Sequence, residues 1–95
     1  MKGMTAVVTG GASGIGKCIV KMLADNGGKV FFVDNDKTAL ECAVDELRTA
    51  GLDVVGHCGD VADERARSEF AAAVLTASTD GIDLLVNNAC ISRGG

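Results

Sequence analysis

Short runs of apolar and β-branched residues recur along the chain and predict four β-strands. These runs lie at residues 5–9, 30–33, 53–58 and 82–87. The second run, Val-Phe-Phe-Val, has no polar position on either face, which is typical of a parallel strand covered by helices on both sides. We therefore expect a single buried parallel sheet.

Between the strands, the apolar period changes to that of a helix, and it does so three times. The predicted buried stripes are Ile15, Cys18, Ile19, Met22 and Leu23 in the first helix; Leu40, Ala43, Val44 and Leu47 in the second; and Ala66, Phe70, Ala73, Val74 and Ala77 in the third. Asn26-Gly27-Gly28 is expected to stop the first helix and Gly51 the second. Asn35 or Asp36 is placed to cap the second helix, and Asp63 to cap the third.

Strands and helices alternate along the chain, which predicts an α/β fold with right-handed crossovers between parallel strands. The expected strand order is 3-2-1-4, with helices on both faces and the sheet ending after the fourth strand. Residues 1–95 are then expected to form one domain.

A glycine-rich segment separates the first strand from the first helix. It reads Thr-Gly-Gly-Ala-Ser-Gly-Ile-Gly over residues 9–16, with glycines at positions that allow a tight turn and close approach to a ligand. Amides at a helix N-terminus donate hydrogen bonds to phosphate oxygens without any cationic side chain. The segment is therefore predicted to bind a diphosphate, with an unliganded glycine turn as the alternative.

Asp34 lies at the end of the second strand, where a carboxylate can accept hydrogen bonds from both hydroxyls of an adenosine ribose. The same negative charge repels a 2′-phosphate, and Lys37 is the only nearby basic residue. The predicted cofactor is therefore NAD rather than NADP. A capping role for Asp34 is the alternative interpretation.

The glycine segment and Asn87-Asn88-Ala89 resemble signatures of the short-chain dehydrogenase/reductase family, and the resemblance extends along the whole chain. It implies that residues 1–95 are a partial dinucleotide-binding domain with a Rossmann-like fold. In such a fold Asp60 and Val61 contact the adenine. The cofactor-binding residues implied are Gly10, Ser13, Gly14, Ile15, Gly16, Asp34, Asp60, Val61, Asn87 and Ala89. Cys90 stands where the family has glycine, which narrows the space beside the nicotinamide ribose.

The resemblance implies an NAD-dependent oxidoreductase that transfers hydride to or from an alcohol or ketone. The family uses a tyrosine, with a serine and a lysine, for this reaction. The sequence contains no tyrosine, so no catalytic residue is assigned and these 95 residues are predicted to be inactive alone.

Two other functions are compatible with part of the pattern. One is a non-catalytic nucleotide-binding or interaction module. The other is part of an adenosyl-methionine methyltransferase, a class that also uses a glycine loop and acidic residues after the second and third strands. Asn87-Asn88-Ala89 and the absence of proline, tyrosine and tryptophan argue against the methyltransferase.

Composition excludes several partners. A net charge of -4 argues against nucleic acid, and no apolar run is long enough to span a membrane. Four scattered cysteines with one histidine predict no metal site, and the absence of an export signal predicts reduced thiols in the cytoplasm. Because a fourth strand at the sheet edge is unpaired, self-association through that edge is also expected.

Overall fold

The computed structural model describes residues 3–12, 14–60, 63–77 and 82–87 of the chain. The elements follow one another as β1 (Thr5–Thr9), α1 (Gly14–Asp25), β2 (Lys29–Asp34), α2 (Lys37–Thr49), β3 (Val54–Cys58), α3 (Glu64–Ala77) and β4 (Leu84–Asn87). All four predicted strands and all three predicted helices are present, and every strand end lies within two residues of its predicted position.

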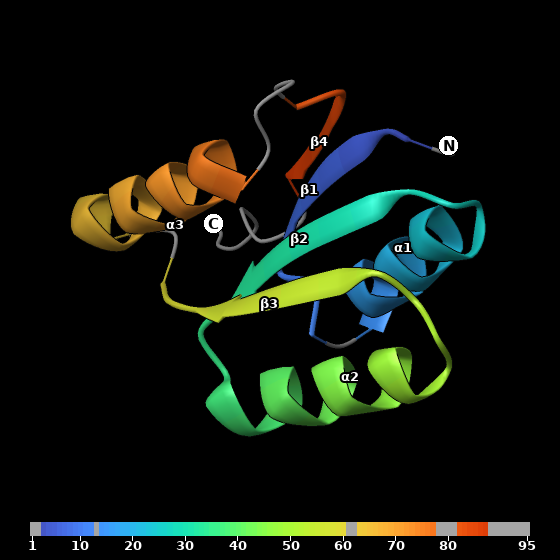
Figure 1. Ribbon diagram of the computed structural model, residues 1–95. Helices are drawn as coiled ribbons and strands as arrows, with labels where there is room; N and C mark the ends of the chain where they lie inside the picture. The colour runs from blue at the N-terminus through green and yellow to red at the C-terminus, as the bar shows by residue number, and fades with distance from the viewer. Residues whose placement is uncertain (1–2, 13, 61–62, 78–81, 88–95) are drawn as a thin grey trace.

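The strands form one parallel sheet in the order β3-β2-β1-β4, as the alternation of elements predicts. Helices α1 and α2 cover one face and α3 the other (Figure 1). The carboxyl ends of all four strands therefore meet at one edge of the sheet. The chain adds β2 and β3 on one side of β1 and then returns to add β4 on its other side. Open α/β sheets bind ligands at the carboxyl ends of the strands where the order reverses in this way.

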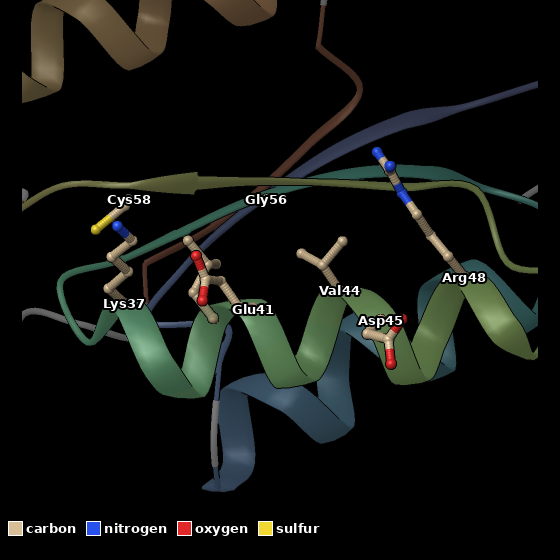
Figure 2. A pocket seen from close by; sticks show the side chains of 8 residues that line it. Lys37, Glu41, Val44, Asp45, Arg48, Gly56 and Cys58 are labelled. Atoms are coloured by element: carbon tan, nitrogen blue, oxygen red, sulfur yellow. The ribbon is translucent and has the colours of Figure 1, made fainter.

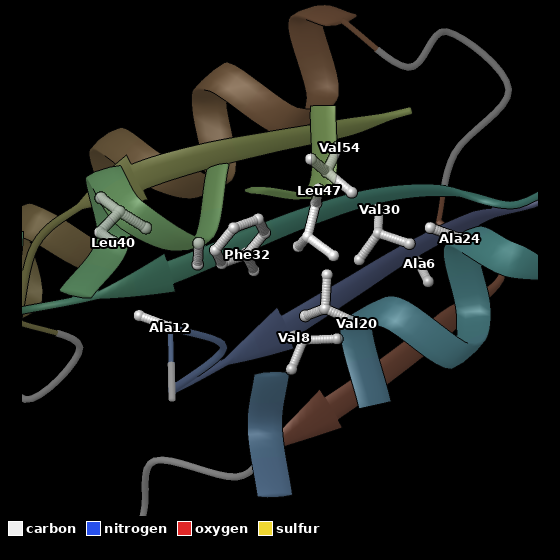
Figure 3. Packing of buried hydrophobic residues seen from close by; sticks show 11 residues of the cluster. Ala6, Val8, Ala12, Val20, Ala24, Val30, Phe32, Leu40, Leu47 and Val54 are labelled. Atoms are coloured by element: carbon white, nitrogen blue, oxygen red, sulfur yellow. The ribbon is translucent and has the colours of Figure 1, made fainter. Parts of the chain in front are cut away.

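The larger part of the core lies between the sheet and helices α1 and α2 (Figure 3). Val8, Val30 and Phe32 project from the sheet and pack against Val20 of α1 and Leu47 of α2. All five side chains are almost completely buried. Burial of this kind contributes about 1.5–3 kcal/mol for each large aliphatic or aromatic side chain.

A smaller core joins α3 to the opposite face of the sheet. Phe70 and Val74 of the helix pack with Val7, Phe31 and Val33 of the strands. Ala73, predicted to belong to this interface, is exposed. The helix thus contacts the sheet mainly through Phe70 and Val74, which are one helical turn apart, and its buried face is narrower than predicted.

The predicted buried stripe of α1 is wrong for three of its members. Ile15 and Met22 are 73% and 56% exposed, and Cys18 is exposed. The residues of α1 that face the sheet are Gly16, Val20 and Ala24, and Ile19 and Leu23 are partly buried beside them. Because Gly16 and Ala24 are small, the helix axis can lie close to the strands.

The second helix agrees with its prediction. Leu40, Ala43 and Leu47 are buried and Val44 packs against them. Of the two predicted caps, Asp36 is the one used: its carboxylate accepts a hydrogen bond from the Ala39 amide at 3.0 Å. The third helix begins after Asp63, whose side chain accepts from the Arg65 amide.

Gly11 is required by packing rather than by its backbone angles. A Cβ atom at this position would lie 2.7 Å from the Cβ of Phe32, which is fully buried. We expect Gly11→Ala to reduce the free energy of unfolding by about 1–3 kcal/mol, because Phe32 cannot move without shifting β2 and the Gly11 amide is bonded to the Val33 carbonyl of the same strand. Urea denaturation of the purified chain measures this.

Gly59→Ala is the matched control, since its added Cβ would meet Ala66 at an ordinary 3.4 Å. It should change stability by less than about 1 kcal/mol, with reduced entropy of the unfolded chain as its main effect. Equal stability of the two variants would contradict the packing argument.

Candidate nucleotide-binding site

The glycine segment forms a bend between β1 and α1. Gly10 and Gly14 have φ angles of 68° and 59°, a region that residues with side chains rarely adopt. The amides of Gly10 and Gly11 both donate to the carbonyl of Val33, at 2.8 and 3.4 Å. The bend is thus attached to the end of the neighbouring strand β2, and α1 begins at its far side with Gly14.

The N-terminal end of α1 suits an anion. Its first turn contains no acidic residue, and Gly16, which faces the sheet, is buried. The first amides of a helix have no acceptors within the helix and carry the positive end of its dipole. Of the predicted ligands in this segment, Ile15 is accessible at 73% exposure, whereas Ser13 lies outside the described residues.

Asp34 ends β2 beside the bend, and both of its carboxylate oxygens accept backbone hydrogen bonds. The Ala12 amide donates to Oδ2 at 3.2 Å, and the Asp36 amide donates to Oδ1 at 3.0 Å. A carboxylate offers about four lone-pair sites, so about two remain for a ligand. This number matches the two hydroxyls of a ribose. The residue that caps α2 is Asp36 and not Asp34, which is the outcome for the alternative interpretation of Asp34 as a helix cap.

Asp60 lies at the same edge of the sheet. Its neighbour Gly59 donates to the carbonyl of Asp34 at 3.0 Å, and Cys58 pairs with Asp34 in the register of β3 and β2. The side chain of Asp60 is exposed. The structure therefore brings Asp60 close to Asp34, while Val61 lies outside the described residues.

Asn87 ends β4 and pairs with Thr9, the last residue of β1. The backbone of β4 thus reaches the edge at which the glycine bend begins. Ala89 and Cys90 lie outside the described residues, so the predicted contacts of this segment with a nicotinamide ribose stay predictions.

Asp83 holds β4 beside β1, a role that the sequence pattern did not predict. Its carboxylate accepts a hydrogen bond from the Thr5 amide at 2.8 Å, and its own amide donates to the Thr5 carbonyl at 2.8 Å. These two bonds fasten the start of β4 to the start of β1 and so set the register that places Asn87 beside Thr9. An acidic residue directly before the apolar run 84–86 is the signal that could have indicated this role.

Other chemistries find no support in the described part of the chain. No group of three or more His, Cys, Asp or Glu residues there could hold a metal ion. Among the same residues, no helix is both long and apolar enough to cross a membrane. Cys18, Cys42 and Cys58 are free and exposed thiols.

A glycine bend, a helix N-terminus and an acidic residue at the switch point of a parallel sheet together define a Rossmann-like nucleotide-binding unit. The family model described as short chain dehydrogenase matches residues 4–95. The chain belongs to this family, which confirms the resemblance seen in the glycine segment and in Asn87-Asn88-Ala89.

Curated relatives agree with this assignment. The chain is 46% identical over 91 residues to the granaticin polyketide synthase putative ketoacyl reductase 1 of Streptomyces violaceoruber, covering 95% of the chain and 33% of that protein. It is 38% identical over 94 residues to a tropinone reductase homologue of Arabidopsis thaliana, covering 99% of the chain and 35% of that protein. The chain thus spans about a third of the length of these relatives.

Solved structures show the same fold. A metagenomic short-chain oxidoreductase in complex with NADP superimposes with a TM-score of 0.86 at 35% identity, over 96% of this chain and 41% of that one. A variant of actinorhodin polyketide ketoreductase with NADPH gives a TM-score of 0.86 at 36% identity, over 97% of this chain and 35% of that one.

Asp34 is expected to hold the glycine bend in place before any ligand binds. Replacing it in Asp34→Ala removes the acceptor of the Ala12 amide and should accelerate hydrogen exchange of that amide, with a loss of about 1 kcal/mol in the free energy of unfolding. Amide exchange measured by NMR reports the Ala12 signal directly.

Asp36→Ala is the matched control. It removes the cap of α2, at a cost of about 1 kcal/mol, but keeps the backbone amide that donates to Asp34. Exchange at Ala12 should then stay slow. Equal protection of Ala12 in both variants would show that Asp34 does not position the bend.

Proposed function

We propose that this chain binds NAD(H) and forms the cofactor-binding part of an oxidoreductase. The observation that carries the proposal is the attachment of the glycine bend to the end of β2 through Asp34. It supports a diphosphate site at the bend with a ribose acceptor beside it. The family to which the chain belongs supports the same conclusion.

The residues present fit a dinucleotide. The amides of the first turn of α1, from Gly14 to Gly16, would hold the diphosphate, because those of Gly10, Gly11 and Ala12 already donate to Val33 and Asp34. The unused lone pairs of Asp34 would accept the ribose hydroxyls, and Asp60 with Val61 would hold the adenine. Asn87 and Ala89 would lie beside the nicotinamide ribose. The nicotinamide ring supplies the hydride acceptor or donor when it is bound.

The proposed preference for NAD rests on charge at the end of β2. Asp34 is half-buried and its carboxylate is fixed by two amides, so it cannot turn away from an incoming 2′-phosphate. Lys37, at the start of α2, is exposed and its charge is screened by solvent. Two related structures contain NADP or NADPH, so this preference needs its own measurement.

Catalysis is proposed to require residues beyond these 95. The sequence holds no tyrosine, the residue that the family uses for proton transfer. The proposed substrates of the complete protein are alcohols or ketones, bound by parts of the fold that this chain does not include. Steady reduction of NAD by the pure chain with any such substrate would contradict this.

Gly14 tests the diphosphate site. In Gly14→Ala the left-handed backbone is strained and the bend must change shape, so NAD affinity should fall by about tenfold or more. Gly51→Ala is the matched control, because Gly51 also has a positive φ and open space around it but lies beyond α2. Isothermal titration calorimetry with NAD measures both variants.

Titrations of the unsubstituted chain test the choice of ligand. ADP should bind within a few-fold of NAD, and NADP should bind more weakly than either because of the charge on Asp34. Tighter binding of NADP would overturn the preference for NAD. Tighter binding of adenosyl-methionine than of NAD would move the chain to the methyltransferase alternative.

We also propose that the chain self-associates through β4. Within the described residues, β4 is an edge strand, and its Leu84 and Leu85 are exposed, Leu85 at 65%, as is Ile82 just before it. Leu85 pairs in register with the buried Val7, so it extends the apolar face of the sheet. An unpaired edge with apolar side chains favours pairing with another strand.

Light scattering at increasing concentration tests this contact. The chain should grow beyond the mass of a monomer, and Leu85→Lys should restore the monomer by placing a charge in the contact. Leu75→Lys, which charges a leucine on α3 that is 58% exposed, is the control and should leave the association unchanged. A clean monomer at high concentration would contradict the proposal.

A further inference from the structure

A groove runs between α2 and the edge strand β3, on the side of the molecule away from β4. It has a volume of about 480 Å³ and is open to solvent. Its lining consists of Lys37, Leu40, Glu41, Val44, Asp45 and Arg48 of the helix and Gly56 and Cys58 of the strand (Figure 2). The nucleotide-binding proposal does not use this groove.

The strand side of the groove is a row of backbone polar groups. In a parallel pair, alternate residues of a strand direct their N–H and C=O groups to the same side. Asp53 bonds to Val30 of β2, so residues 53, 55 and 57 face β2 and residues 54, 56 and 58 face outward. The bond from Arg48 Nε to the Val54 carbonyl, 3.1 Å long, confirms this direction.

Two of these outward-facing residues remain open to a partner. Arg48 donates a hydrogen bond to the Val54 carbonyl, so this carbonyl at the start of β3 already has a partner. Within the described chain, β3 is the outermost strand, and nothing pairs with the outward backbone groups of Gly56 and Cys58. These are the two strand residues that line the groove.

The floor of the groove is formed by close packing of α2 on a glycine. A Cβ atom at Gly56 would lie 2.5 Å from Cγ2 of Val44 and 3.0 Å from Cδ1 of Leu40. The helix therefore lies near the strand, and the apolar floor is shallow. An added backbone could rest on it while its alternate side chains meet the exposed side of α2.

Four charged residues line the helix side in the order positive, negative, negative, positive: Lys37, Glu41, Asp45 and Arg48. They follow one side of α2, and Figure 2 shows Lys37 beside Cys58 at one end and Arg48 reaching β3 at the other. No ion pair joins Lys37, Glu41 or Asp45 to another residue of the described chain. Their charges are therefore available to a partner.

This charge order disfavours a second copy of the chain in the groove. An antiparallel pairing of two β3 strands about a twofold axis would place Lys37 near Arg48 of the other copy. It would also place Glu41 near Asp45 of the other copy. Like charges directly opposite are destabilising. The groove is thus protected against self-pairing but complementary to a different strand.

We propose that this groove binds an extended peptide segment of a partner protein, which adds a strand to the sheet beside β3. Its backbone pairs with Gly56 and Cys58. Its side chains that face α2 run acidic, basic, acidic, so that the basic one meets Glu41 and Asp45. From Lys37 to Arg48 the helix spans roughly 16 Å, which corresponds to about five extended residues.

The test uses the full 95-residue chain and a blocked synthetic peptide, Glu-Val-Lys-Val-Glu. NMR titration should shift the amide signals of Gly56 and Cys58, with weaker binding as salt is raised. The charge-inverted peptide Lys-Val-Glu-Val-Lys should bind about tenfold more weakly, because each opposite-charge contact becomes repulsive.

Charge reversal in the protein should exchange this preference. In the double variant Glu41→Lys, Asp45→Lys, the inverted peptide should become the tighter ligand. The control Glu64→Lys, Glu69→Lys changes net charge equally on α3 and should keep the original preference. Methylation of the peptide nitrogens that face β3 should abolish binding, since those amides pair with the strand.

Three results would overturn the proposal. They are equal affinity for the two peptides, unchanged affinity after N-methylation, and shifts that avoid Gly56 and Cys58. A dimer whose formation depends on Gly56 and Cys58 would also overturn it, since the occupant would then be a second copy. None of these measurements requires a nucleotide, so they succeed or fail independently of the NAD proposal.

Discussion

The carboxylate of Asp34 connects the glycine bend to the start of α2 through two hydrogen bonds, and the candidate site depends on this connection. It accepts the amide of Ala12 from the glycine bend and the amide of Asp36 from the start of α2. The Val33 carbonyl accepts two further amides from the bend. A bend that is already ordered costs less conformational entropy when a ligand binds, which favours affinity.

The same hydrogen bonds of Asp34 constrain how the proposed cofactor preference could be changed by substitution. A basic residue at position 34 would attract a 2′-phosphate, but it would also leave the Ala12 and Asp36 amides without their acceptor. The related structures solved with NADP and NADPH have nearly the same backbone over this chain. The fold therefore does not decide the preference. The proposed preference therefore rests on the side chains at the end of β2, where Asp34 also holds two backbone amides.

Much of the fold could be predicted because hydrophobic periodicity and glycine positions both report backbone geometry. The strands, their order, the buried face of α2 and the bend with Asp34 at its side all follow from these patterns. The buried face of α1 does not. Ile15 and Met22 are its larger apolar residues, yet close approach to the sheet selects the line that carries the small Gly16 and Ala24.

Contacts between distant residues explain what the patterns missed in the site. The bond from Ala12 to Asp34 depends on how the bend folds back over β2, and the bonds between Asp83 and Thr5 depend on which strand lies beside β1. Neither has a local signature, because an aspartate after or before an apolar run is also a common turn or cap residue.

The two edges of the sheet differ in chemistry, and this difference decides what each can bind. At β4 the exposed side chains are apolar, so contact there depends on buried area and selects partners weakly. At β3 the groove carries charges of both signs in a fixed order, so a wrong partner meets repulsion. A strand that pairs at β3 must match that order, whereas one that pairs at β4 needs only an apolar surface. The β3 edge is therefore the one able to discriminate among partners.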